Sequence, residues 1–116
     1  MSVWEFSDNV LVQCHDSFVV GSAPKGIEVH GSEGSILGVD VMAQAPGGSV
    51  TVRTKAGERV VPLEPKVAYH RSIADFAAAV RGVGKPSASG EDGVWSLKLA
   101  KAVVASVTYG RAVTIG

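Results

Sequence analysis

Short valine-rich runs alternate with glycine-containing turns over residues 3–63, and this pattern constrains the fold more than any other feature of the chain. The extended runs cover residues 3–6, 10–20, 27–30, 35–41, 49–54 and 58–63. Turn sequences such as Asp8–Asn9 and Lys55–Ala56–Gly57 separate them and are typical of tight hairpins. Because parallel strands need long crossover connections, about six strands with such short gaps are expected to be largely antiparallel.

Apolar residues alternate with polar ones inside these runs. In the second run, Val10, Val12 and Cys14 share one face by the two-residue period, while Gln13 and His15 share the other. The run at 27–30 repeats the pattern, with Glu28 and His30 on the polar side. We therefore predict a sheet with one apolar face and one mixed face.

The spacing changes to a helical one after Pro65. Apolar residues at positions 69, 73, 76 and 80 predict an amphipathic helix that ends at Arg81–Gly82. A loop at Gly84–Lys85–Pro86 follows, and Ser89 then provides a hydroxyl cap for a second helix over 91–109. The second helix is apolar on most of its circumference, which predicts that it is covered on more than one side. Residues 112–115 are predicted to form a final strand.

These elements predict an α+β fold, with a mostly antiparallel open sheet and two helices packed on one face, in a single domain over residues 1–116. A loop is predicted at Gly21–Gly26, around Pro24.

Composition excludes several functions. The 11 basic and 11 acidic residues balance and form no long run, so we expect neither a nucleic-acid partner nor a membrane surface. No apolar stretch approaches the roughly 20 residues of a membrane helix. A single cysteine, Cys14, suits a reducing compartment, and we expect a cytoplasmic protein.

Motifs for cofactor or metal binding are missing from the sequence. No Gly-x-Gly-x-x-Gly fingerprint occurs, and Gly84–Lys85 lacks the upstream glycine and following hydroxyl of a phosphate-binding loop. The three histidines lack the spacing of zinc ligands. We therefore predict no catalytic, cofactor-binding or metal-binding residue on this chain. The polar residues of the mixed face are the candidates for substrate or interface contacts: Gln13, His15, Glu28 and His30. The alternative is that they are ordinary surface polar residues.

The chain resembles a known family over nearly its whole length, and the order of motifs in its second half is the strongest match. The motifs are Tyr69-x3-Ile73-x-Asp75-Phe76-x2-Ala79-Val80-Arg81-Gly82, Lys85-Pro86, Ser89-Gly90-Glu91-Asp92-Gly93, Leu97-x-Leu99-Ala100-x-Ala102-x3-Ser106 and Gly110-Arg111-x-Val113. With Glu28–Ser35 upstream, this succession resembles the C-terminal domain of the Gfo/Idh/MocA oxidoreductases, the group of glucose–fructose oxidoreductase and inositol dehydrogenase.

The resemblance implies a two-domain enzyme, in which an N-terminal Rossmann domain binds NAD or NADP and the C-terminal domain supplies the sheet, part of the substrate pocket and commonly a dimer interface. The family's catalytic lysine lies in a Glu-Lys-Pro element, and its catalytic acid and histidine lie on an early helix of the C-terminal half. None has a counterpart here, because Lys85–Pro86 belongs to the later loop. The first strand and catalytic helix of the domain are expected to be missing, so we predict a homodimer through the sheet and a possible Rossmann-domain partner.

Three functions are compatible with these features. The first is the substrate-binding and dimerisation domain of an NAD(P)-dependent sugar or polyol dehydrogenase, inactive alone. The second is a stand-alone dimeric module that partners a separate cofactor-binding subunit. The third is a small independent enzyme that uses His15, His30 and Asp16, and the opposed orientation of His15 and Asp16 on one strand disfavours it.

Overall fold

The computed structural model describes residues 1–23 and 25–116, so Pro24 in the predicted loop lies outside the described residues. The chain divides into two compact units. The terminal unit comprises residues 1–21 and 88–116, and the central unit comprises residues 22–87.

The terminal unit contains a β-hairpin and a long helix. Strands β1 (Ser2–Glu5) and β2 (Leu11–Cys14) pair antiparallel, with Ser2 opposite Cys14, and the short 3-10 turn η1 (Ser7–Asn9) joins them. Asp8 and Asn9 adopt positive φ values of 70° and 59°, as expected for an Asp-Asn turn. Helix α2 spans Gly90–Tyr109 and ends at Gly110, which has a left-handed φ of 62°.

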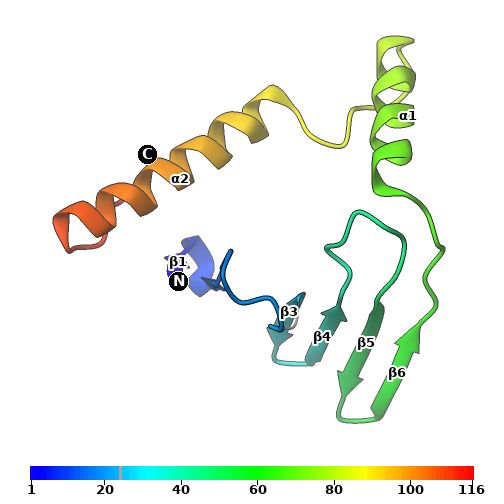
Figure 1. Ribbon diagram of the computed structural model, residues 1–116, viewed down its shortest axis with the longest axis horizontal. Coiled ribbons are helices and arrows are strands. Elements are labelled where there is room, and N and C mark those ends of the chain that lie inside the picture. Colours follow the sequence, from blue (N-terminus) through cyan, green and yellow to red (C-terminus); the bar gives the residue numbers. More distant parts are fainter. Residues whose placement is uncertain (24) are drawn as a thin grey trace. The chain divides into compact units, whose positions relative to one another are not determined.

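The central unit contains a four-stranded antiparallel sheet followed by one helix. Strands β3 (Gly26–Gly31), β4 (Gly34–Val39), β5 (Ser49–Thr54) and β6 (Gly57–Val61) lie side by side in chain order, as Figure 1 shows. Helix α1 (Ala68–Val80) follows β6. It ends where the N–H groups of Gly82 and Val83 donate to the carbonyls of Ala79 and Ala78, which is the Schellman arrangement.

The structure confirms the α+β class with antiparallel strands. Two strand predictions are wrong. The run at 10–20 is paired only as far as Cys14, because β1 offers four residues to pair with and Ser2 already lies opposite Cys14. Residues 112–115 form no strand. The C-terminal residue is instead bound to α2, because Lys98 Nζ donates a hydrogen bond to the Gly116 carbonyl oxygen at 2.7 Å. The packing of both helices on one face of a sheet stays a prediction.

The helices and strands leave their apolar side chains open. Within residues 1–23 and 25–116, no hydrophobic side chain is fully buried. On α1 the side chains at 69, 73, 76 and 80 predicted to form its apolar stripe are between 58% and 72% exposed. Covering these side chains would remove apolar area from water, which is the main driving force for packing.

The N-terminus of α2 carries a complete capping box. Asp92 N–H donates to Ser89 Oγ at 3.2 Å, and Ser89 N–H donates to Asp92 Oδ2 at 2.8 Å. The pKa of the Asp92 carboxyl lies below its ordinary value of 3.8. The main cause is the hydrogen bond that its carboxylate accepts from the Ser89 backbone, and a smaller contribution comes from the Ser89 side chain. Both bonds satisfy N–H groups that the first helical turn leaves without an internal partner.

Replacing Ser89 with alanine is expected to destabilise α2 by about 1 kcal/mol, because the Asp92 N–H loses its acceptor. Far-UV circular dichroism through a urea titration measures this. Ser96→Ala is the matched control, since Ser96 Oγ only donates to the Asp92 carbonyl one turn earlier in the same helix. Equal losses in both variants would contradict the cap.

Candidate functional site

Four side chains line up across the mixed face of the four-stranded sheet. The register places His30 of β3 opposite Ser35 of β4, Ser35 opposite Arg53 of β5, and Arg53 opposite Glu58 of β6. Residues directly opposite in antiparallel strands share a face, so these four form one line, which we call the polar row. Glu28 lies two residues before His30 and therefore on the same face.

The opposite face of this sheet is mainly apolar and also carries Arg59, which the register places opposite Val52. Its aliphatic residues, taken from the same register, are Ile27, Val29, Ile36, Val50, Val52 and Val61. Ile27, Val29 and Ile36 remain 47% to 57% exposed. The predicted division of the sheet into an apolar and a mixed face is therefore present in the central unit.

Hydrogen bonds join Glu28, His30 and Ser35 into a chain. His30 Nδ1 lies 2.8 Å from Ser35 Oγ, and His30 Nε2 lies 3.2 Å from Glu28 Oε2. An ionised carboxylate only accepts hydrogen bonds, so Nε2 carries the proton. In the neutral imidazole Nδ1 is then the acceptor, and the Ser35 hydroxyl donates to it.

The other half of the polar row is an ion pair between Arg53 Nε and Glu58 Oε1. Its two side chains are 57% and 53% exposed, and the His30 and Glu28 side chains are both 62% exposed. Exposed ion pairs contribute about 0–1 kcal/mol to stability. The polar row is therefore an open surface whose geometry comes from the strand register.

The structure brings together two of the four predicted candidates. Glu28 and His30 are in contact on β3. Gln13 lies exposed on β2, where its Nε2 donates to Met1 Sδ at 3.2 Å, and His15 is exposed just after the end of β2. Strand β2 pairs with β1 whereas β3 pairs with β4, so Gln13 belongs to a different sheet from Glu28 and His30. Their role in substrate or interface contacts stays a prediction.

Sequence reasoning missed Ser35, Arg53 and Glu58. The signal was available in the two hairpins. A two-residue turn between Gly31 and Gly34 places position 30 opposite position 35, and the turn between Thr54 and Gly57 places position 53 opposite position 58. Hairpin register, rather than a sequence motif, would have identified these partners.

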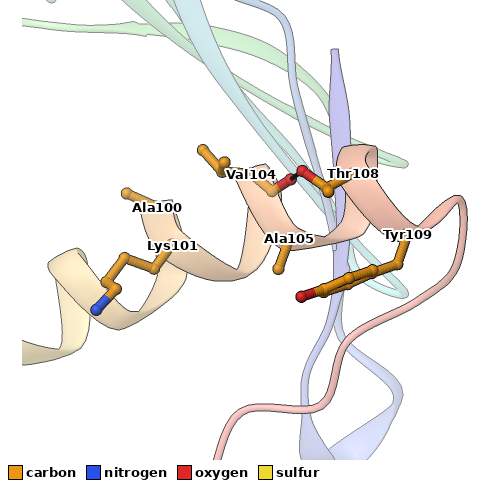
Figure 2. A pocket seen from close by; sticks show the side chains of 6 residues that line it. All are labelled: Ala100, Lys101, Val104, Ala105, Thr108 and Tyr109. Atoms are coloured by element: carbon orange, nitrogen blue, oxygen red, sulfur yellow. Dashed lines mark hydrogen bonds between the residues drawn. The ribbon is translucent and has the colours of Figure 1, made fainter.

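A shallow groove runs along α2 in the terminal unit (Figure 2). The residues that line it all come from this helix: Ala100, Lys101, Val104, Ala105, Thr108 and Tyr109. Thr108 Oγ1 donates to the Val104 carbonyl oxygen at 2.9 Å, so this hydroxyl is already satisfied within the helix. Three of these residues, Lys101, Ala105 and Thr108, are spaced i, i+4 and i+7 and therefore share one side of the helix. Apart from Lys101 and the hydroxyls of Thr108 and Tyr109, the groove presents apolar groups, which suit packing against another element better than catalysis.

Within the residues that the structure describes, no group of three or more His, Cys, Asp or Glu side chains is placed to hold a metal ion. None of the helices described is both long enough and apolar enough to cross a membrane.

The sequence is similar to that of a known sugar reductase. The chain is 47% identical over 110 residues to 1,5-anhydro-D-fructose reductase of Ensifer adhaerens, and the match covers 95% of this chain. It covers 33% of the reductase, so the chain spans about a third of the length of that relative. No protein-family model matches the sequence. The chain is therefore homologous to part of an oxidoreductase.

Proposed function

We propose that this chain is the C-terminal, substrate-side segment of an NAD(P)-dependent sugar or polyol oxidoreductase of the Gfo/Idh/MocA type. The observation that carries the proposal is the match of 95% of the chain to a third of a sugar reductase at 47% identity. The order of family motifs along the second half of the sequence supports the same assignment. The nicotinamide-binding half and the proton-transferring side chains would come from the remainder of such an enzyme, because hydride transfer needs both.

In this proposal the sheet contributes substrate and interface contacts, and the rest of the enzyme carries out the hydride transfer. The mixed face, with Glu28 and His30, offers hydrogen-bonding groups to a hydroxylated substrate. The apolar face and the stripe of α1 are open, and covering them against a second copy or another domain removes apolar area from water. A homodimer formed through the sheet is part of the proposal.

A second function rests on the same open surfaces. The chain would be a dimeric module that docks onto a separate cofactor-binding subunit, and its exposed apolar side chains would be the docking contacts. A neighbouring reading frame that encodes a Rossmann domain favours one divided enzyme, whereas an unlinked subunit that co-purifies with the chain favours this module.

Light scattering of the purified chain, with NADH and NADPH titrated into the same sample, tests the proposal. We expect a dimer mass and no change in nicotinamide fluorescence, because the sequence holds no dinucleotide fingerprint. A monomer that binds either cofactor would overturn the proposal.

A further inference from the structure

We propose that Glu28, His30 and Ser35 form an acyl-transfer site that cleaves small, unhindered carboxylic esters, with Ser35 as the nucleophile. This activity needs no nicotinamide cofactor and is independent of the oxidoreductase assignment. The hydrogen-bonded chain Ser35–His30–Glu28 carries the inference, because it has the order of groups that activates a serine: hydroxyl, imidazole, carboxylate.

The distances meet the geometric requirement for nucleophile activation. Ser35 Oγ and His30 Nδ1 are 2.8 Å apart, and His30 Nε2 and Glu28 Oε2 are 3.2 Å apart. Nucleophile and base must lie within about 2.6–3.2 Å, with a third group to orient the base. Glu28 fixes the Nε2–H tautomer and leaves Nδ1 as the base beside the hydroxyl.

Ester cleavage at this site needs only Ser35, His30 and a water molecule, and it proceeds in two stages. Ser35 Oγ attacks the ester carbonyl carbon and forms a C–O bond, while its proton passes to Nδ1 of His30. The bond to the leaving alkoxide then breaks, and Nδ1 returns the proton to that alkoxide. Water attacks the acyl-serine in the same way, which releases the carboxylic acid and restores the Ser35 hydroxyl.

Arg53 provides positive charge for the oxyanion. It lies directly opposite Ser35 on β5, where cross-strand neighbours have Cβ atoms about 5 Å apart. Its Nε–H donates to Glu58 Oε1. The other N–H groups of the guanidinium remain to stabilise the negative charge that develops on the ester carbonyl oxygen. The His30 and Glu28 side chains are both 62% exposed, so the site is open to water, the reactive esters are small and the acceleration is modest.

The test uses the intact chain and p-nitrophenyl acetate, followed by p-nitrophenol release and by mass spectrometry of the acetylated peptide. We expect a burst with acetyl on Ser35, and a loss of at least about tenfold in rate for Ser35→Ala and His30→Ala. Ser32→Ala is the matched control, because Ser32 lies in the adjoining Gly31–Gly34 turn, outside the hydrogen-bonded chain. Its burst should equal that of the unmodified protein.

Glu28 is a positioning residue, and its test is separate. Glu28→Gln is expected to lower kcat several-fold with KM unchanged, since the carboxylate acts on the imidazole and does not touch the ester. Circular dichroism spectra that match the unmodified chain verify folding for every variant. A burst that survives Ser35→Ala, acetyl found on another residue, or no burst from the folded protein would each overturn the site. None of these results bears on the nicotinamide-dependent proposal.

Discussion

Replacement of Gly48 by alanine is expected to lower the free energy of unfolding of the central unit by about 2 kcal/mol or more. Gly48 has a φ of +85°, a left-handed conformation that side chains other than glycine rarely adopt. A Cβ atom at this position would lie 2.5 Å from the Val39 carbonyl oxygen and 2.8 Å from the Asp40 carbonyl carbon. Both neighbours are backbone atoms at the end of β4, so relief of the clash would pull β4 away from β5.

The adjacent glycine gives a matched control. A Cβ added at Gly47 meets nothing within 4 Å, and its φ lies outside the positive range. Gly47→Ala should therefore stay within about 0.5 kcal/mol of the unmodified chain. Urea unfolding monitored by circular dichroism measures both variants. Similar losses at the two positions would show that the loop, and not the close approach at Gly48, sets the effect.

Mixing this chain with the part of the Ensifer adhaerens reductase that it does not match is expected to produce NAD(P)H oxidation that depends on 1,5-anhydro-D-fructose, while the chain alone gives none. The expected effect is all or none, because the proposal assigns the cofactor site to the part outside the match. Oxidation followed by absorbance, after co-expression of the two parts, is the measurement.

Two controls make the outcome decisive. Co-elution of the two parts on size exclusion shows whether they associate, so that failed assembly is separated from a failed assignment. The intact reductase sets the scale of activity. Substrate-dependent oxidation by the chain alone, or a co-eluting pair with no activity, would contradict the proposed function.

Sequence reasoning located the hairpins and the helices well because their signals are local. The helix around Ile73 was predicted from its apolar spacing, and α1 spans Ala68–Val80. The Ser89 hydroxyl was predicted to cap the second helix, and it accepts from the Asp92 N–H. A cap or a turn depends on residues within four positions of one another, so one sequence holds all the information needed.

The errors lie where pairing partners decide the outcome. Valine-rich residues after Cys14 were predicted to continue a strand, and residues 112–115 to form another. A strand exists only where a second strand offers its N–H and C=O groups, and β1 is too short to extend β2. The conformations of these segments are therefore not readable from their own propensities.

The candidate site shows the same division. The period of two placed Glu28 and His30 on one face from the sequence alone. That Ser35 meets His30, and that Arg53 and Glu58 continue the line, follows from the three pairings among four neighbouring strands. By itself the sequence determined the two helices, the Ser89 cap, the tight turns and the α+β class, because these depend on nearby residues. Only the tertiary structure decided that β4 pairs with β5 in the register that brings Ser35 opposite Arg53, because no tight turn joins these two strands to fix their register.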